Sequence, residues 1–329
     1  MAADILEIGD LRVAPGELRF GALEGIYLRD SSRVDIPITV LRGEASGPTL
    51  WIDAAMHGPE IVGVEVIRRV MREELNPSRL RGTIVAAPIL NPLAYQAQEM
   101  NTPQDEVNFN RVFPGNPRGL TSQRLAARVL NEGVLKADAA INFHANALPA
   151  MPFAIVGGGD GPADRRAREM AEAFGLTTIR MRVSNEPHRT GTISAAAAVA
   201  GTPVLVIELI PWRRLDEPGV SVGVRGTLNV LRHLGMLDGE LEPQAGIPII
   251  PGSLTRTEVT VDKGGLAYPL KQPGDAVQAG EMILVLRNPY GDIVEEVRSP
   301  VDGWVLAFPF RLNQAAVTGD YVAFIAYRL

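Results

Sequence analysis

The chain has 329 residues, 46% of them hydrophobic, and at this length one hydrophobic core usually gives way to two domains. Its formal net charge of -6 argues against nucleic acid as a partner, because binding to phosphates relies on clustered Lys and Arg. The absence of cysteine excludes disulfides, thiolate metal sites and a cysteine nucleophile.

The N-terminus and the apolar runs predict no membrane attachment. The first ten residues, MAADILEIGD, lack the basic and then apolar segments of a signal peptide, and no apolar run is long enough to span a bilayer. We therefore expect a soluble cytoplasmic protein that acts on a small molecule, with neither nucleic acid nor membrane as a partner. The oligomeric state stays open, a homo-oligomer included.

The first elements in chain order lead to a candidate metal-binding pair. Residues 1–48 alternate apolar and polar side chains in short runs, which predicts edge strands, and residues 49–70 predict a strand that runs into a helix. His57 and Glu60 lie three apart in the turn between them, so a ring nitrogen and a carboxylate oxygen can reach one point. Catalytic zinc sites often use two His and one Glu. The alternative is a solvated His before a Glu that favours the helix N-terminus.

Strands and helices alternate downstream of this pair. Apolar runs at 82–90, 138–143, 152–157, 177–183 and 203–209 predict strands, and helical patterns occur at 121–136, 162–175, 192–200 and 219–236. Such alternation indicates βαβ crossovers, so we expect an α/β fold with a mostly parallel mixed sheet and helices on both faces. Sheets of this class bind their ligands at the carboxyl ends of the strands.

Three ionisable residues directly follow or close predicted strands: His57, His144 and Glu208. Because the carboxyl ends of parallel strands meet at one edge, we expect the three side chains to lie close together. Glu208 follows five apolar residues, so it must reach solvent or find a partner that offsets its burial. The alternative for Glu208 is an ion pair with Arg213 or Arg214.

The segment 105–115 (DEVNFNRVFPG) is polar and long for a connection, as functional loops often are. The planar fork of Arg111 suits a substrate carboxylate, with Asn108 or Asn110 adding neutral hydrogen bonds. The alternative is that Asn110 and Arg111 only form contacts within the loop.

Other motifs receive structural interpretations. The glycine-rich stretch 157–161 has Pro162 where a dinucleotide fingerprint needs a glycine, so we expect a turn. The alanine-rich run 195–200 lies in a predicted helix and indicates close packing. No Gly-x-Ser-x-Gly elbow offers a serine nucleophile. His188 is interpreted as part of a surface loop and His233 as structural.

From about residue 246 the helical periodicity stops and short β-rich runs take over, so we predict two domains, 1–245 and 246–329. The second resembles a biotinyl or lipoyl carrier-type all-β fold. Its expected hairpin tip, 288–292 (NPYGD), has no lysine to carry a prosthetic group. We therefore expect a domain that caps the active site or mediates assembly. Glu295, Glu296 and Arg298 are the candidates to enter the pocket, and the sequence does not decide among them.

Together these motifs resemble the succinylglutamate desuccinylase/aspartoacylase family of zinc carboxypeptidase-like hydrolases, over nearly the whole chain. The matching segments are His57-Gly-Pro-Glu60, Asn91-Pro92, Asn108-Phe-Asn-Arg111-Val-Phe-Pro-Gly115, Phe143-His144 and Ile207-Glu208-Leu209. The resemblance implies one zinc ion per chain on His57, Glu60 and His144. It also implies Glu208 as general base and proton shuttle, and Arg111 with Asn110 as the clamp for the substrate carboxylate.

The reaction implied is hydrolysis of the amide bond of a small N-acyl amino acid or a related amide. A metal activates water and polarises the carbonyl, and a Glu can carry the proton to the leaving amine, which leaves poorly unless protonated. Carboxypeptidase activity on short peptides and non-catalytic binding of a small acidic ligand are the alternatives.

The sequence departs from the family pattern at three places. An Arg that often precedes the Asn-Arg pair is replaced by Met100-Asn101-Thr102, so either the substrate preference has changed or another Arg, such as Arg189 or Arg213, takes over its role. Asn142 stands where relatives have an Asp, and Ile210-Pro211-Trp212 stands where relatives have glycines.

Overall fold

The computed structural model describes residues 5–182, 190–310 and 314–329. His188 and Arg189 lie outside these ranges. The strands are β1 (Leu6–Ile8), β2 (Leu11–Val13), β3 (Leu18–Tyr27), β4 (Arg33–Arg42), β5 (Ala45–Asp53), β6 (Arg81–Ala87), β7 (Ala139–Ala145), β8 (Phe153–Val156), β9 (Thr177–Arg180), β10 (Val204–Leu209), β11 (Leu254–Thr260), β12 (Gly265–Pro269), β13 (Ala276–Val277), β14 (Met282–Arg287), β15 (Ile293–Arg298), β16 (Gly303–Ala307), β17 (Ala315–Ala316) and β18 (Tyr321–Arg328).

The helices are α1 (Val62–Arg69), α2 (Pro92–Ala97), α3 (Thr121–Arg128), α4 (Pro162–Phe174), α6 (Ile193–Val199) and α7 (Glu217–His233). Short π-helical segments extend α1 over Val70–Glu74 and α3 over Val129–Gly133, and single 3-10 turns lie at Pro77–Arg79, Phe109–Arg111 and Val134–Lys136. Each helix expected downstream of residue 120 lies within three residues of its predicted bounds at both ends, once the turns that extend α3 are counted. None of the helices in the described ranges is long and apolar enough to cross a bilayer.

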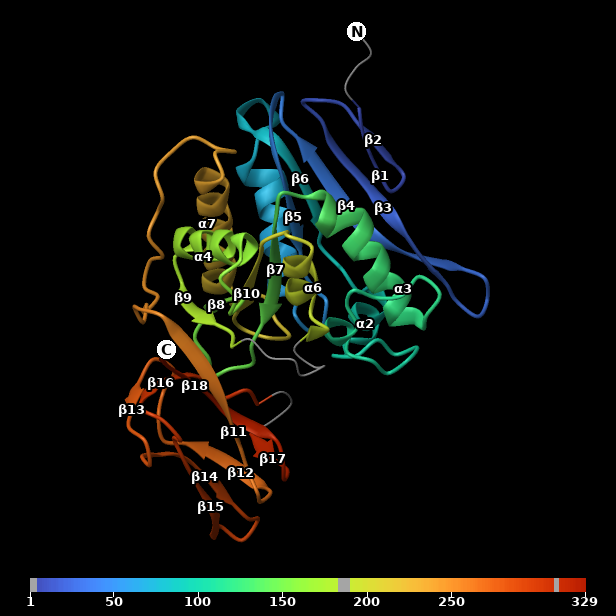
Figure 1. The fold of residues 1–329 in the computed structure, drawn as a ribbon. Helices are drawn as coiled ribbons and strands as arrows, with labels where there is room; N and C mark the ends of the chain where they lie inside the picture. Colours follow the sequence, from blue (N-terminus) through green and yellow to red (C-terminus); the bar gives the residue numbers. More distant parts are fainter. Residues whose placement is uncertain (1–4, 183–189, 311–313) are drawn as a thin grey trace.

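A twelve-stranded mixed sheet forms the centre of the molecule (Figure 1). Its strand order is β13-β16-β18-β11-β9-β8-β10-β7-β5-β6-β4-β3. The four adjacent strands β10, β7, β5 and β6 are parallel to their neighbours within this group, whereas β4 and β3 are antiparallel at the edge. The predicted mixed sheet with a parallel centre and N-terminal edge strands is therefore confirmed.

Helices cover both faces of this sheet, as the sequence predicts (Figure 1). One core contains buried residues of α1, α4 and α7, and the other contains buried residues of α3 and α6. Strand β10 serves both cores because its side chains alternate: Leu205 and Ile207 join the first, and Val204 and Val206 join the second.

Helix α4 explains the glycine-rich stretch before it. Pro162 occupies the first turn of α4, where its missing N–H costs no hydrogen bond, and Gly175 ends the helix with a φ of 87°. The stretch 157–161 is thus the connection between β8 and α4, in agreement with the turn predicted there.

The C-terminal part is all-β, with antiparallel sheets, and lies beside the α/β layers in Figure 1. Strands β15, β14, β12 and β17 form a separate sheet that shares a core with β11, β16 and β18. The large sheet runs across the boundary, because Leu254 of β11 pairs with Ile179 of β9. The amides of Met151 and Phe308 add hydrogen bonds of 2.9 Å between the two parts.

Candidate metal centre and adjoining cavity

Strand order brings the predicted site residues to one edge of the sheet. Strand β7 lies between β5 and β10, and Glu208 of β10 is the register partner of His144 on β7. Paired residues on parallel strands point their side chains to the same side, so these two residues are neighbours. His57 and Glu60 occupy the turn after β5, which leaves the strand through Ala55 at a φ of 48°. That left-handed conformation is strained for a non-glycine residue and is typical of functional sites.

Close packing of α1 on the sheet sets the position of Glu60. A Cβ added at Gly63 would lie 2.6 Å from the Cβ of Phe143 and 2.9 Å from that of Ala54. Glycine therefore allows α1 to approach β7 directly behind His144. As a result, the turn that carries Glu60 lies close to the strand that carries His144.

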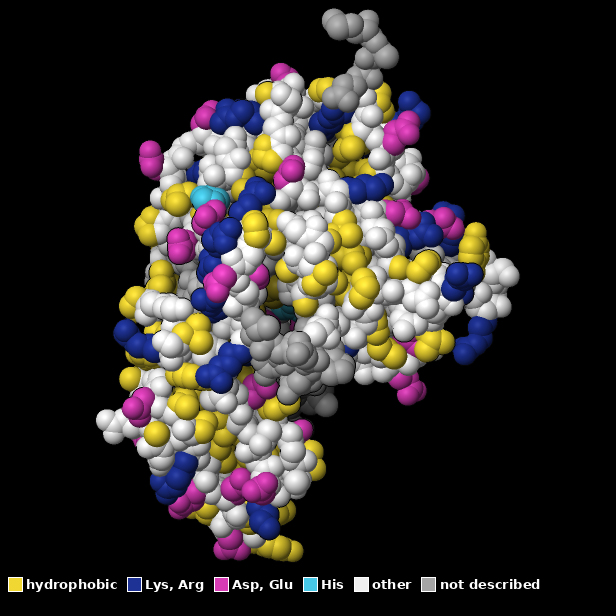
Figure 2. Space-filling model, viewed as in Figure 1, with side chains coloured by type: hydrophobic (Ala, Val, Ile, Leu, Met, Phe, Trp, Pro, Cys, Tyr) yellow, Lys and Arg dark blue, Asp and Glu magenta, His cyan; other side chains and the backbone are white. Residues whose placement is uncertain are grey.

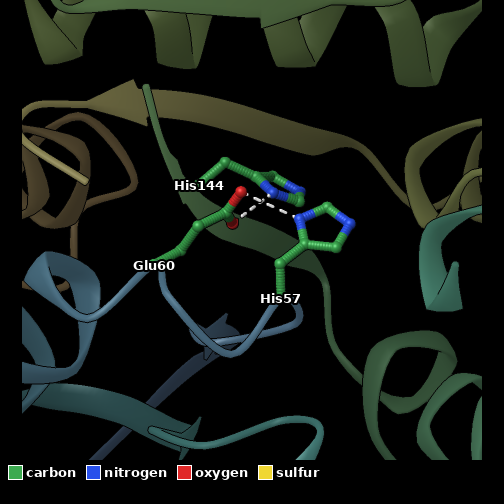
Figure 3. Close-up of side chains that lie close together, drawn as sticks. All are labelled: His57, Glu60 and His144. Carbon is green, nitrogen blue, oxygen red and sulfur yellow. Dashed lines mark hydrogen bonds and ion pairs between the residues drawn. The ribbon is translucent and has the colours of Figure 1, made fainter. Parts of the chain in front are cut away.

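His57, Glu60 and His144 form a buried cluster (Figure 3). The Nδ1 atom of His57 lies 2.9 Å from Oε1 of Glu60, and the Nδ1 atom of His144 lies 2.7 Å from Oε2. One ligand atom from each residue lies within 4.8 Å of the other two, and each side chain is at most 7% exposed. Two ring nitrogens and a carboxylate oxygen thus face a common point, as a metal centre requires.

Asn108 fixes the orientation of the His57 ring. Its Oδ1 atom accepts a hydrogen bond from the backbone N–H of Asn110 at 2.9 Å, which identifies that atom as the oxygen. The Nε2 atom of His57 lies 3.1 Å from the same oxygen and must therefore donate to it. The donating nitrogen leaves Nδ1 for a ligand on the side of Glu60, an arrangement common around metal-binding His.

Asn110 contacts the ring of His144 through its side-chain amide. Its Oδ1 accepts from the backbone N–H of Ile193 at 2.9 Å, and its Nδ2 lies 3.4 Å from Nε2 of His144. The ring centroids of His57 and His144 are 5.0 Å apart. The loop 105–115 therefore contacts both His rings, and Asn108, which the sequence suggested as a substrate contact, lies against His57 of the candidate metal centre.

The charged forms of the residues in the cluster stabilise one another. Burial alone would raise the pKa of Glu60, but the positive charges of His57 and His144 outweigh it and lower this pKa to about 2. Burial would lower the pKa of His144, yet the charge and hydrogen bond of Glu60 raise it to about 9. In the absence of a metal, His144 is therefore protonated at neutral pH, and a metal must displace that proton.

Glu208 lies beside the cluster and is not part of it. Its Oε2 accepts a hydrogen bond of 2.9 Å from the side-chain amide of Asn146. Burial raises the pKa of Glu208, the charge of His144 opposes this rise, and the charge of Glu60 adds to it. A carboxyl group with a raised pKa beside the candidate metal ligands suits proton transfer near neutral pH.

A cavity of about 460 Å³ adjoins His144 and Glu208. Asn110 and Arg111 border it, and Arg256 and Glu258 of β11 reach it from the C-terminal region. Figure 2 shows a recess near the middle of the face drawn, with a histidine side chain visible inside it. On the same face acidic and basic side chains are interspersed, without a large basic patch.

Arg213 does not take the place suggested for it. Its guanidinium donates to the carbonyl oxygen of Gln98 at 3.5 Å and stacks over Trp212, with 4.8 Å between Cζ and the ring centroid. Within the described ranges, Arg213 is not among the residues that border the cavity beside Glu208. Arg189 lies outside the described residues.

The C-terminal residues proposed to enter the pocket are also placed elsewhere. Glu295 accepts hydrogen bonds from backbone N–H groups at 262 and 263, and Glu296 pairs with Arg298 at 2.6 Å. Arg256, which sequence reasoning missed, lies instead in the cavity with its side chain 14% exposed, and its charge lowers the pKa of Glu208.

Sequence reasoning also missed Asp53, which is fully buried at the end of β5. Its carboxylate accepts hydrogen bonds from Trp51 Nε1 and from the side chain of Asn142, its register partner on β7. Burial raises the pKa of Asp53 to about 6, and the hydrogen bonds from Trp51 and Asn142 and the charge of His144 only partly offset this rise. The sequence marks Asn142 only as a departure from the family pattern.

Comparison with known proteins agrees with this geometry. Residues 46–234 match the model of the succinylglutamate desuccinylase/aspartoacylase catalytic domain. The chain is 29% identical over 305 residues to the N-alpha-acetyl-L-2,4-diaminobutyric acid deacetylase of Halomonas elongata, a match that covers 89% of this chain and 86% of that protein. A succinylglutamate desuccinylase/aspartoacylase structure from Rhodobacter sphaeroides superposes with a TM-score of 0.83 at 27% identity and covers 95% of each chain.

The fold likeness extends to carboxypeptidases. A metallo-carboxypeptidase structure from Burkholderia cenocepacia superposes with a TM-score of 0.52 at 15% identity, over 67% of this chain and 65% of that one. This likeness concerns the fold alone, and it confirms the carboxypeptidase-like architecture expected from the sequence.

Proposed function

Because the chain belongs to the succinylglutamate desuccinylase/aspartoacylase family, we propose that it is a zinc-dependent hydrolase that cleaves the amide bond of a small N-acyl amino acid. The observation that carries this proposal is the buried cluster of His57, Glu60 and His144, with Glu208 as the strand neighbour of His144. The similarity to a deacetylase from Halomonas elongata supports the reaction class.

The donor set fits one zinc ion per chain. Two imidazole nitrogens and one carboxylate oxygen are a common ligand set of catalytic zinc, and they leave a position for water or substrate. When bound, zinc supplies a Lewis acid that polarises the scissile carbonyl and makes water acidic enough to ionise near neutral pH. Asn108 keeps the Nδ1 atom of His57 directed toward this site.

Glu208 carries the proton in the proposed mechanism. Its carboxylate takes a proton from the attacking water and delivers it to the nitrogen of the leaving amine. Asn146 holds one carboxylate oxygen by a hydrogen bond of 2.9 Å, so the group has a defined orientation. Burial raises the pKa of Glu208, which makes the protonated form accessible for the second transfer.

Arg111 and Asn110 are proposed to bind the carboxylate of the substrate, since both border the cavity beside His144. We also propose that residues 246–329 form a second domain that closes the cavity, because Arg256 and Glu258 of β11 border it. A wall of this kind would limit the enzyme to small substrates.

The test is the Glu208→Gln variant. We expect it to bind zinc as the wild type does, while turnover falls about 10²–10⁴-fold because the proton shuttle is lost. Zinc content and hydrolysis of a panel of N-acetyl amino acids, with and without chelator, are the measurements. Glu217→Gln, which changes a carboxylate on the surface of α7, is the control and should leave both unchanged.

Two outcomes contradict the proposal. Normal turnover of the Glu208→Gln variant would exclude Glu208 as the proton shuttle. A zinc-replete wild type without turnover would favour a non-catalytic binding protein.

A second candidate is a carboxypeptidase for short peptides, which the fold likeness to a metallo-carboxypeptidase favours. Dipeptides with a free N-terminus and the matching N-acetyl amino acids distinguish the two activities, because only a carboxypeptidase prefers the former.

A further inference from the structure

The cavity continues past the proposed catalytic groups along one face of β10. Val204, Val206 and Glu208 alternate on this strand, and all three border the cavity. Four residues of extended strand span ~13 Å, so the cavity has an arm well beyond the reacting bond. Ile155 of the neighbouring strand β8 also borders this arm.

The alanine-rich run of α6 keeps this arm open. Ala195 and Ala198 border the cavity, while Ala197 is buried in the core on the same side of the sheet. Ala167 of α4 is a further small residue of the wall. Close packing was expected for the whole run, but Ala195 and Ala198 border space that larger side chains would fill.

The glycine-rich connection forms the far end of the arm. Gly157 and Gly159 border the cavity together with Asp164. A Cβ added at Gly157 would lie 2.0 Å from Oδ1 of Asp164, and one at Gly159 would lie 2.3 Å from Oδ2. Because these glycines have no side chain, the backbone can pass close to the carboxylate of Asp164, which lies at the end of the apolar arm.

The arginines near this end are already engaged. Arg180 pairs with Asp160 at 2.6 Å and donates to the carbonyl oxygen of Gly158 at 2.9 Å. Arg182 borders the cavity, and its guanidinium lies 5.4 Å from the ring centroid of Tyr327. Asp164 is thus the acidic side chain at this end, whereas Asp160 belongs to an exposed ion pair.

The proposed function decides which half of the substrate lies in this arm. If Arg111 and Asn110 hold the α-carboxylate, the amino acid half occupies the cavity that they border. Its side chain then extends along Val204 and Val206 toward Asp164.

We propose that this arm selects a side chain with a long aliphatic stem and a cationic tip, so that the preferred substrates are N-acyl derivatives of lysine or arginine. The stem removes apolar surface from water against the valines and alanines. The tip forms a charge-assisted hydrogen bond with Asp164. This inference rests on the proposed function and extends it to a substrate class.

The experiment compares Nα-acetyl-lysine with Nα-acetyl-norleucine, which has the same stem without the charge. For the zinc-loaded wild type, kcat/KM should be higher for the lysine substrate, and also higher than for Nα-acetyl-diaminobutyrate, whose short stem does not reach Asp164. In Asp164→Asn the lysine-to-norleucine ratio should fall about tenfold or more, as expected for a hydrogen bond to a charged group. Asp160→Asn is the matched control on the same connection and should leave the ratio unchanged.

A second variant tests whether the arm of the cavity holds the side chain of the substrate. Ala198→Leu should fill the arm, so turnover of the lysine substrate should fall while turnover of Nα-acetyl-alanine persists. Equal values for lysine and norleucine in the wild type, or a ratio that Asp164→Asn does not change, would overturn the inference.

Failure of the proposed function can be told apart from failure of this inference. A zinc-loaded protein that hydrolyses no substrate would reject the hydrolase. Calorimetry with free lysine and norleucine would then test the arm alone, and binding of lysine that Asp164→Asn weakens more than Asp160→Asn would support it.

Discussion

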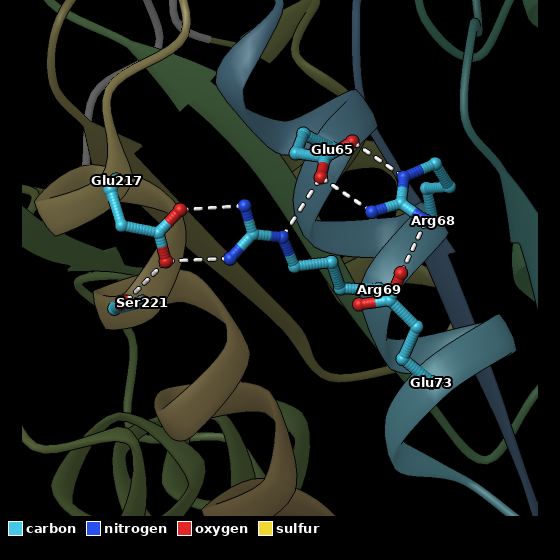
Figure 4. Close-up of polar contacts among 6 residues, drawn as sticks. All are labelled: Glu65, Arg68, Arg69, Glu73, Glu217 and Ser221. Carbon is cyan, nitrogen blue, oxygen red and sulfur yellow. Dashed lines mark hydrogen bonds and ion pairs between the residues drawn. The ribbon is translucent and has the colours of Figure 1, made fainter.

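Two carboxylates five residues apart each bridge a pair of basic side chains, yet only one belongs to a candidate site. Glu60 lies between His57 and His144, at 2.9 and 2.7 Å. Glu65 on α1 lies between Arg68 and Arg69, at 2.7 and 2.8 Å (Figure 4). The pKa of each carboxyl group is lowered to about 2, that of Glu65 chiefly by the hydrogen bond from Arg68.

The two clusters differ in burial and in the chemistry of their bases. The side chains of the metal-centre cluster are 5–7% exposed, whereas Arg68 is 48% exposed and Glu217, which extends the surface cluster from α7, is 61% exposed. Arginine keeps its proton in proteins, whereas imidazole can lose one and bind a metal. A lowered carboxyl pKa therefore does not identify a site unless the partners can act as ligands and water is excluded.

The largest expected effect comes from removing the buried bridge. Loss of a residue that merely supports a metal ligand costs about 10–100-fold in affinity, so Glu60→Gln, which alters a proposed ligand, should cost more than about 100-fold in zinc affinity. Turnover should fall with it. Glu65→Gln should leave zinc content and turnover unchanged. Equal zinc content in the two variants would contradict the conclusion that only the buried cluster binds zinc.

Asp53 sharpens the comparison, because it is buried and its two hydrogen-bond donors, Trp51 and Asn142, are neutral. Its pKa is about 6 in the folded protein, against 3.8 for an unperturbed Asp, and this difference of about two units corresponds to about 3 kcal/mol. The folded state holds the proton more tightly, so this stabilisation is complete below the unfolded pKa and is lost as pH rises toward about 6.

The measurement is denaturant unfolding of the metal-free protein between pH 4 and 7. The wild type should lose about 2 kcal/mol more unfolding free energy over this range than Asp53→Asn does, because part of the stabilisation is already lost at pH 4. Parallel pH profiles of the two proteins would mean that Asp53 is already ionised when the protein is folded at pH 4.

A smaller effect concerns competition between metal and proton. The pKa of His144 is about 9 in the metal-free protein, so zinc binding near pH 7 should release one proton at this residue. Its contribution to the apparent zinc affinity should fall about tenfold for each pH unit below that value. Calorimetry in buffers of different ionisation enthalpy counts the protons, and the absence of any release would contradict a protonated His144.

The smallest effect is expected in the surface cluster. Glu217→Gln removes the negative charge that contacts Arg69 at 2.6 Å between α7 and α1. Solvent screens exposed ion pairs, so the melting temperature should stay within experimental error of the wild type at physiological salt. A drop of several degrees would show that exposed ion pairs stabilise this protein more than the comparison of the two clusters predicts.

The sequence predicted that His57, Glu60 and His144 lie close together, because the signal at each residue is local. His57 follows β5, and His144 and Glu208 lie at the carboxyl ends of β7 and β10, which share one edge in an α/β fold. The strand order that makes β7 the neighbour of both β5 and β10 was not predicted, although it decides which carboxylate lies beside His144.

The residues that were missed depend on contacts across the chain. Nothing near Arg256 or Asp164 in sequence indicates that β11 and the start of α4 border the same cavity. The burial of Asp53 depends on its register with Asn142 on another strand. The alanine run and the glycine-rich stretch were correctly assigned to a helix and a connection, but their part in the cavity appears only in three dimensions.

The sheet that runs from β9 into β11 limits how this protein can be rearranged. Exchanging the C-terminal segment with that of a relative would also exchange Arg256 and Glu258, and so alter the wall of the cavity. Deleting the segment would remove β11 from one side of β9, leave β9 as an edge strand that pairs only with β8, and invite self-association through the exposed edge. Chimeras that treat this segment as an interchangeable module are therefore expected to change selectivity and solubility at once.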